Sequence, residues 1–211
     1  MSYISIIIPA YNEEKRIAAT LTKILNYLSA KDYLWEIILV DDGSSDRTVE
    51  TAKEAIKDER LKVIKNPVNK GKGYSVKRGV MTSRGEIILF SDADLSTPIE
   101  ELDKMILWLN EGYDIVIGSR ALPESAIEIR QPWYREIMGK TFNVMVKNLG
   151  LSGFRDTQCG FKCFKREAAL KAFNLQKING FAFDVELLYI AKKFGIKIKD
   201  VPVRWINSPE S

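Results

Sequence analysis

The sequence predicts an α/β fold in which a mainly parallel sheet carries helices on both faces. Two observations support this prediction. Apolar runs of strand length recur through residues 1–120, and amphipathic segments of helical periodicity separate them. The strands are also apolar throughout instead of alternating with polar residues, which is typical of parallel strands that are buried on both faces.

The elements of the first half follow one another regularly. Strands are expected over residues 4–8, 36–40, 61–64, 86–90 and 114–118. Helices are expected from about Asn12, around Val49 to Ile56, from Gly71, and after Pro98, whose fixed φ suits a first helical turn.

The pattern changes after Arg120. Residues 121–135 are polar, contain two prolines and are expected to form a loop, whereas residues 133–150 have the periodicity of an amphipathic helix. A strand at 161–164, helices at 166–173 and 181–194, and an alternating segment at 196–203 complete the chain. Neither a repeat nor a low-complexity linker interrupts the sequence, so residues 1–211 are expected to form one domain.

The composition excludes several classes of function. The chain has no His, which excludes Ser-His triads and His-ligated zinc. Cys159 and Cys163 lack the number and spacing of a zinc site or a disulfide scaffold. A net charge of +4 is too small to indicate nucleic-acid binding. No apolar run approaches the roughly 20 residues that span a bilayer, and the chain starts on a strand instead of a signal peptide. We therefore expect a cytoplasmic protein.

Polar residues gather where the expected strands end. In open α/β sheets, ligands bind beyond the carboxyl ends of the strands. Residues 11–13, 41–46 and 92–94 and Arg120 all follow strands of the first half. The candidate site is therefore expected at this edge of the sheet.

The pair Asp92 and Asp94 is the sharpest chemical feature of that edge. Two carboxylates one residue apart at the end of a buried strand repel each other unless a cation compensates, and Mg²⁺ usually binds together with substrate phosphates. Alternatively, both side chains cap backbone amides of the next turn. Residues 92–97 also look like the nucleophile motif of haloacid-dehalogenase-type phosphatases, but the strands before them and the lack of a later acidic pair disfavour that class.

Three other turns carry weaker signals. Asp42 is expected either to accept hydrogen bonds from a nucleobase or to belong to an Asx turn. Asn12 is expected to cap a helix. Its two neighbours, Tyr11 and Glu13, are placed to contact a nucleoside. Residues 71–73 form a phosphate cradle or simply begin a helix, because they lack the P-loop pattern.

Taken together, five segments resemble family 2 glycosyltransferases with the GT-A fold. They are residues 8–13, 40–46, 69–73, 92–94 and 118–120, which occur in the family's order and at its spacings. Within the family, residues 156–162 and 203–205 are similar to dolichyl-phosphate glucosyltransferases. Dolichyl-phosphate mannose synthases are the second-nearest group, and Ser96 and Ala182 depart from their pattern, which favours a UDP-sugar over GDP-mannose.

The resemblance implies a role for individual residues. The nucleoside would be held by Pro9, Tyr11, Glu13, Val40 and Asp42. Ribose and pyrophosphate would be held by Asp92, Ala93 and Asp94, and Lys72 would also bind the donor. Asp92 and Asp94 would bind Mg²⁺ or Mn²⁺, with Asp94 as the more direct ligand. The phosphates of donor and acceptor would be bound by Arg120, Arg135 and Arg204, and Asp156 would orient Arg120 or Arg135.

The resemblance also implies an activity, namely inverting transfer of a hexose, with UDP-glucose as the favoured donor, to dolichyl or another polyprenyl phosphate. Such a phosphate is already anionic at pH 7, so its attack needs no strong general base. This is compatible with a chain that has no His. Residues 1–120 would bind the nucleotide-sugar and residues 121–211 the acceptor. Trp133 and Tyr134 beside Arg135 suit the cytoplasmic face of a membrane.

Three alternatives remain open: a GDP-mannose donor, a glycan acceptor with Asp156 as the base, and a nucleotide-binding module without catalysis. The intact pair of Asp92 and Asp94 disfavours the last.

Overall fold

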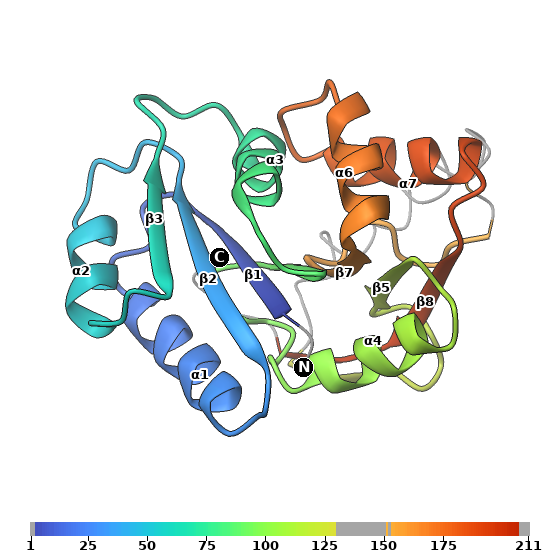
Figure 1. Cartoon of the computed structure of the whole chain (residues 1–211), viewed down its shortest axis with the longest axis horizontal. Helices are drawn as coiled ribbons and strands as arrows, with labels where there is room; N and C mark the ends of the chain where they lie inside the picture. Colours follow the sequence, from blue (N-terminus) through green and yellow to red (C-terminus); the bar gives the residue numbers. More distant parts are fainter. Residues whose placement is uncertain (1–2, 130–150, 152, 207–211) are drawn as a thin grey trace.

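The main feature of the fold is a seven-stranded sheet with helices on both sides (Figure 1). The structure is a computed structural model that describes residues 3–129, 151 and 153–206. The strand order is β3-β2-β1-β4-β7-β5-β8. The strands are β1 (Tyr3–Ala10), β2 (Leu34–Asp41), β3 (Leu61–Lys65), β4 (Ile87–Ser91), β5 (Ile115–Ser119), β7 (Phe161–Lys165) and β8 (Ile198–Pro202). Only β7 runs antiparallel to its neighbours, so the prediction of a mainly parallel sheet is confirmed.

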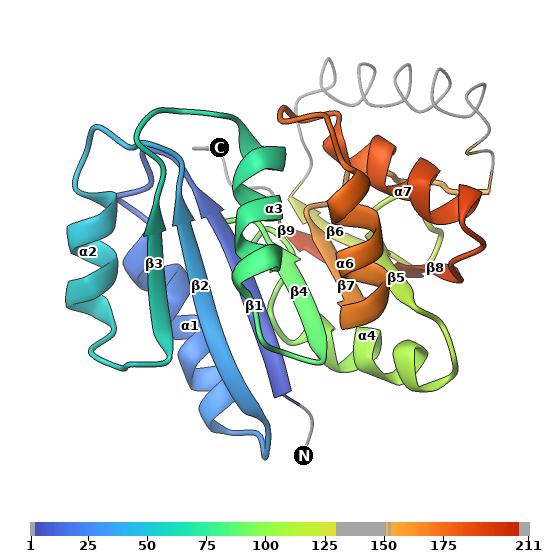
Figure 2. The same ribbon diagram turned by 45° about the horizontal axis from the view of Figure 1, so that its top comes forward.

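The helices form two layers on opposite sides of the sheet (Figure 2). One layer holds α1 (Ile17–Ser29), α2 (Thr48–Ala55) and α4 (Glu101–Asn110), and the other holds α3 (Lys72–Thr82), α6 (Arg166–Leu175) and α7 (Phe183–Lys193). Successive strand residues point to opposite faces. Ile6 and Ile8 therefore pack under the first layer, and Ile7 packs under the second. Both faces are buried, which explains why the strands are apolar throughout.

Two local expectations are wrong. Helix α1 begins at Ile17 and not near Asn12, because Asn12 has a left-handed φ of 55° and its side chain accepts a hydrogen bond from the Ser45 amide at 2.9 Å. The segment before α1 is thus a turn fastened to the β2–α2 connection. The loop expected over 121–135 contains β6 (Ala126–Ile129), which pairs in parallel with β9 (Arg204–Ile206). Residues 126–128 are exposed, so no buried apolar pattern marked this strand.

The reversed strand β7 matters for the position of the candidate site. In the register between β4 and β7, Ser91 at the end of β4 lies opposite Phe161 at the beginning of β7. The residues that lead into β7 therefore reach the same edge as Asp92 and Asp94.

The amphipathic helix expected over 133–150, including Trp133, Tyr134 and Arg135, lies outside the described residues. Within the part of the chain that the structure describes, no helix has the length and apolar character to cross a membrane.

Candidate active site

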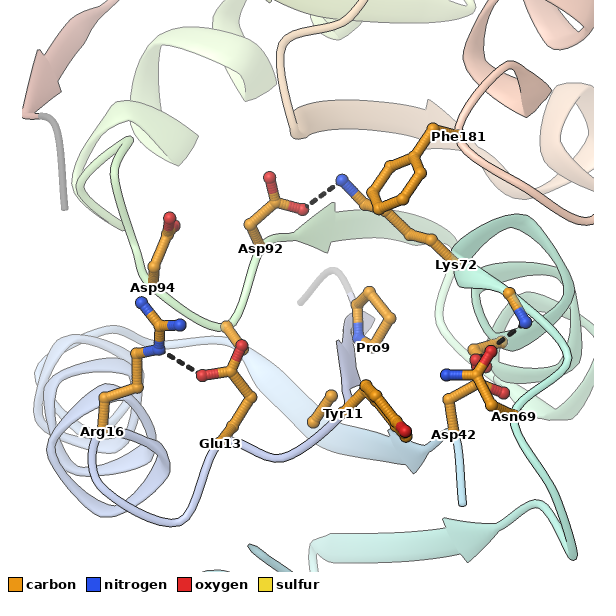
Figure 3. A pocket seen from close by; sticks show the side chains of 14 residues that line it. Pro9, Tyr11, Glu13, Arg16, Asp42, Asn69, Lys72, Asp92, Asp94 and Phe181 are labelled. Carbon is orange, nitrogen blue, oxygen red and sulfur yellow. Dashed lines mark hydrogen bonds and ion pairs between the residues drawn. The ribbon is translucent and has the colours of Figure 1, made fainter. Parts of the chain in front are cut away.

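Two cavities lie at the carboxyl edge of the sheet. The larger one, of about 520 Å³, is lined by residues that follow β1, β2 and β4 and by the start of α3 (Figure 3). The smaller one has a volume of about 180 Å³ and is lined in part by Arg120 and Trp205. Asp92 and Asp94 line both cavities, so this acidic pair marks the junction between them.

Asp92 is held from two sides. Its Oδ1 forms an ion pair with Lys72 Nζ at 2.6 Å, and its backbone N–H donates to the Gly160 carbonyl at 3.1 Å. A Cβ at position 160 would lie only 1.9 Å from Asp92 Oδ2, so any larger residue there would displace the Asp92 carboxylate. Burial disfavours the charge on Lys72, but Asp92 and then Asp184 outweigh burial and raise the pKa of Lys72 above its ordinary value.

Asp94 lies in a tight turn. Its Oδ1 accepts a hydrogen bond from the Ser96 amide at 2.9 Å, and the Leu95 amide donates to the Asp92 carbonyl at 3.1 Å. Leu95 adopts a left-handed φ of 46°, which is uncommon for a residue with a side chain, and strained residues of this kind cluster at functional sites. Asp94 therefore caps the turn with one oxygen and still lines both cavities.

Glu13 and Arg16 form an ion pair on the wall of the larger cavity. Figure 3 shows the Arg16 guanidinium between Glu13 and Asp94. Burial raises the pKa of Glu13, and Asp94 adds to the rise, although Arg16 opposes it. Arg16 thus screens two carboxylates from each other. Arg16 was not among the predicted site residues, although its spacing of three residues from Glu13 was a usable signal.

Asp42 lines the larger cavity and also fastens the connection between β3 and α3. Its carboxylate accepts hydrogen bonds from Asn66 Nδ2 at 2.7 Å, the Lys70 amide at 3.0 Å and the Gly71 amide at 2.8 Å. An ionised carboxylate has about four acceptor sites. These three bonds leave one of them for a ligand, so Asp42 has a structural task in addition to the predicted contact with a base.

Arg120 is fixed by Asp156. The two side chains form a bidentate pair at 2.6 and 3.0 Å, and the Arg120 amide donates to Asp156 Oδ2 at 3.0 Å. The guanidinium also lies 5.6 Å from the centre of the Trp205 ring. Burial favours the neutral carboxyl, but the Arg120 charge and hydrogen bonds outweigh it and lower the pKa of Asp156. The geometry therefore gives Asp156 the task of holding Arg120.

The structure brings most, but not all, of the predicted residues to the cavities. The larger cavity is lined by the predicted residues Pro9, Tyr11, Glu13, Asp42, Lys72, Asp92, Ala93 and Asp94. Val40 lines neither cavity, because its side chain is fully buried in the core. Arg204 also lines neither; its side chain is half exposed and lies 3.4 Å from Glu128. Arg135 lies outside the described residues.

Residues distant in sequence supply parts of the cavities that sequence reasoning missed. Phe181, just before α7, lines the larger cavity and is 75% exposed, and Gln158 and Trp205 line the smaller one. Gln158 and Trp205 lie in the segments 156–162 and 203–205 that carry the family resemblance, but no site role was predicted for either residue or for Phe181. Tertiary contacts bring all three to this edge.

The chemistry of the site fits a divalent cation that binds together with phosphates. Among the described residues, no group of three or more acidic, Cys or His side chains surrounds a common point. Asp92 and Asp94 alone offer too few ligands for a complete shell. Mg²⁺ keeps water and substrate phosphates as ligands, and Mn²⁺ accepts the same oxygen donors.

Comparisons with known sequences identify the family of the chain. The glycosyl transferase family 2 profile matches residues 5–173. The dolichyl-phosphate beta-glucosyltransferase ALG5C of Trichomonas vaginalis is 41% identical, over 96% of this chain and 64% of that protein. The human dolichyl-phosphate beta-glucosyltransferase is 38% identical, over 96% of this chain and 67% of that protein. The chain thus spans just under two thirds of the length of the T. vaginalis relative.

Solved structures agree with the fold. Glucosyl-3-phosphoglycerate synthase from Mycobacterium tuberculosis, solved with Mn²⁺, UDP and glucosyl-3-phosphoglycerate, superposes with a TM-score of 0.73. The two are 23% identical, and the match covers 99% of this chain and 74% of that chain. The fold is therefore of the GT-A type, and with the profile match and the relatives it shows that the chain belongs to glycosyl transferase family 2.

Proposed function

We propose that this protein transfers glucose from UDP-glucose to dolichyl or another polyprenyl phosphate, with inversion at the anomeric carbon. The observation that carries this proposal is the acidic pair Asp92 and Asp94 at the junction of two cavities, with a cation on each side in Lys72 and Arg120. The dolichyl-phosphate beta-glucosyltransferases that resemble the chain support the same choice of sugar and acceptor.

The donor would occupy the larger cavity. Its nucleoside would lie against Pro9 and Tyr11, with Asp42 accepting a hydrogen bond from the base. Its pyrophosphate would lie near Asp92, Asp94 and Lys72. Mg²⁺ or Mn²⁺ held by the two aspartates would neutralise the charge that develops on the departing diphosphate. Lys72 would donate hydrogen bonds to the oxygens of this diphosphate.

The acceptor phosphate would enter from the smaller cavity. One of its oxygens would form a bond to the anomeric carbon while the bond from that carbon to the diphosphate oxygen breaks, so UDP leaves and the configuration inverts. The nucleophile is already anionic, so no residue needs to remove a proton. Arg120, held rigid by Asp156, would orient this phosphate. Apart from Arg120, residues 1–120 would act mainly on the donor and residues 121–211 mainly on the acceptor.

A lipid acceptor implies that the reaction takes place at a membrane surface. We propose a peripheral position on the cytoplasmic face. Trp133, Tyr134 and Arg135 remain the predicted contacts, since aromatic and basic side chains together suit the headgroup region.

Transfer of labelled sugar tests the proposed function. The chain would be incubated with Mn²⁺, dolichyl phosphate and either UDP-[¹⁴C]glucose or GDP-[¹⁴C]mannose. Label from UDP-glucose is expected in the organic phase as an acid-labile lipid phosphoglucose. Label from GDP-mannose alone would support the mannosyltransferase alternative. Binding of UDP without transfer to any lipid or glycan acceptor would support a non-catalytic module.

A second prediction concerns Gly160. In Gly160→Ala, the new methyl group would displace the Asp92 carboxylate and its ion pair with Lys72, because the two atoms cannot lie 1.9 Å apart. We expect calorimetry to show UDP·Mn²⁺ binding at least about tenfold weaker, which corresponds to the loss of one charge-assisted hydrogen bond. Gly153→Ala is the matched control, because nothing lies within 4 Å of the added carbon. Equal affinity in both variants would contradict the role of Asp92.

A further inference from the structure

A second buried ion pair lies beneath the donor cavity, and the proposed chemistry leaves it without a task. Lys162 on β7 is fully buried, and its Nζ donates to Asp184 Oδ1 and to the Cys159 carbonyl, both at 2.6 Å. Asp184 is 3% exposed and lies in the first turn of α7. Replacing such a pair with apolar side chains is often neutral or stabilising. Stability alone is therefore a weak reason for these two charges.

The pair is connected to the acidic site through the turn before β7. The carbonyl that Lys162 holds belongs to Cys159, and the next residue is Gly160. Gly160 contacts the Asp92 carboxylate, and its own carbonyl accepts the Asp92 amide. A shift of the Lys162 ammonium group would therefore move the surface against which Asp92 rests.

The pair is also connected to Lys72. The Nζ atoms of Lys72 and Lys162 lie 5.9 and 5.2 Å from the centre of the same ring, that of Phe90. The starts of α3 and α7 are in contact, because a Cβ on Gly73 would lie 2.6 Å from Phe183 Cβ. Asp184 directly follows Phe183. Among the charges that raise the pKa of Lys72, Asp92 has the largest effect and Asp184 the second largest. Lys72 therefore lies in the field of two carboxylates, one in the cavity and one beneath it.

We propose that Lys162 and Asp184 are positioning residues for the donor phosphates, a role that rests on the proposed function. Lys162 fixes the Gly160 turn against Asp92. Asp184 is a second counter-charge of Lys72, and it keeps this lysine at the cavity floor when the bound donor engages Asp92. The unit of donor recognition thus comprises four alternating charges, Asp92, Lys72, Asp184 and Lys162.

The decisive variant replaces both buried charges at once. Lys162→Met with Asp184→Leu leaves no unpaired buried charge and is expected to keep the fold, as judged by circular dichroism and thermal melting. Calorimetry with UDP and Mn²⁺ is expected to show a Kd at least about tenfold higher than in the unaltered chain, because Lys72 and Asp92 lose their supports. The increase in Tm that UDP·Mn²⁺ produces should shrink in parallel.

A remote buried carboxylate provides the matched control. Glu36 is 1% exposed and bonds Ser5 Oγ at 2.7 Å and Lys62 Nζ at 2.5 Å. It lies near the amino end of β2, whereas the cavities lie beyond the carboxyl ends of the strands. Glu36→Gln and Asp184→Asn both remove one buried charge without changing size. Only Asp184→Asn is expected to weaken UDP·Mn²⁺ binding, while both variants lower Tm.

The outcomes separate this inference from the proposed function. If the unaltered chain does not bind UDP·Mn²⁺, the proposed donor is wrong. If it binds and the apolar double variant has the same Kd, the positioning role is overturned and the pair serves only stability. If the double variant fails to fold, the comparison of Asp184→Asn with Glu36→Gln decides by the same Kd, and equal affinity again overturns the role.

Discussion

Replacing Asp94 by alanine is expected to lower sugar transfer by roughly a hundredfold or more, because the variant loses a carboxylate that would hold the divalent cation opposite the charge on the departing diphosphate. The fold should persist. Asp94 lies on a polar rim, and the bond that its side chain makes to the Ser96 amide contributes only about 1 kcal/mol to the free energy of unfolding. The measurements are transfer from labelled UDP-glucose, and calorimetry of UDP with and without Mn²⁺.

The isosteric variant Asp94→Asn separates the two tasks of this side chain. Its amide oxygen can still accept the Ser96 hydrogen bond, but it carries no charge. Asp94→Asn should therefore melt like the unaltered chain and bind UDP equally with and without Mn²⁺. If the unaltered chain also binds UDP with the same affinity in the presence and absence of Mn²⁺ or Mg²⁺, Asp94 is a turn cap and not a metal ligand.

The second large effect is expected at Arg120. Arg120→Ala removes the guanidinium that Asp156 holds with a bidentate pair, and transfer to a lipid phosphate should fall by roughly a hundredfold. UDP binding should change much less, because Arg120 lines the smaller cavity and not the larger one. A comparable loss in UDP affinity would show that Arg120 serves the donor first.

Asp156→Asn tests whether Asp156 is a holder or a base. As a holder, Asp156 affects transfer through the orientation of Arg120, so the variant should lose activity uniformly with pH. A pH profile that loses its acidic limb in the variant would instead identify a base and favour a glycan acceptor.

Stability at low pH supplies a second readout for the same variant. The folded-state pKa of Asp156 is lowered, so the pair with Arg120 stabilises the fold above the unfolded pKa of about 4 and loses this effect as the pH falls through the folded value. Asp156→Asn should show a smaller loss of Tm over that acidic range.

The edge where the site lies was predictable because it depends on local patterns. Apolar strands followed by polar turns place Asp42, Asp92 and Asp94 beyond carboxyl ends, whatever the remaining topology is. The direction of β7 was not predictable, since the apolar pattern of a buried strand is the same whether the strand runs parallel or antiparallel to its neighbours. The contact between Asp156 and Arg120 was expected from the family resemblance, whereas the contact between Gly160 and Asp92 was not predicted.

Side-chain partnerships were harder to foresee than strand positions. The tasks of Lys162 and Asp184 depend on a contact across 22 positions, and local periodicity places Asp184 only somewhere in a helix. Val40 differs from these two residues because the family resemblance does assign it a role, namely contact with the nucleoside. The structure places its side chain in the core, since Val40 lies inside a buried strand.

The reversed strand β7 also constrains the order in which the chain can fold during synthesis. Strands β3, β2, β1 and β4 are consecutive neighbours, so they can pair once residues 3–91 have left the ribosome. Strand β5 comes next in the sequence, but its neighbours in the sheet, β7 and β8, are synthesised later. Pairings between distant segments form slowly. The nascent chain therefore exposes Asp92 and Asp94 until β7 is synthesised and pairs with β4, so the smaller cavity, which Gly160 lines, is completed later than the strands before it.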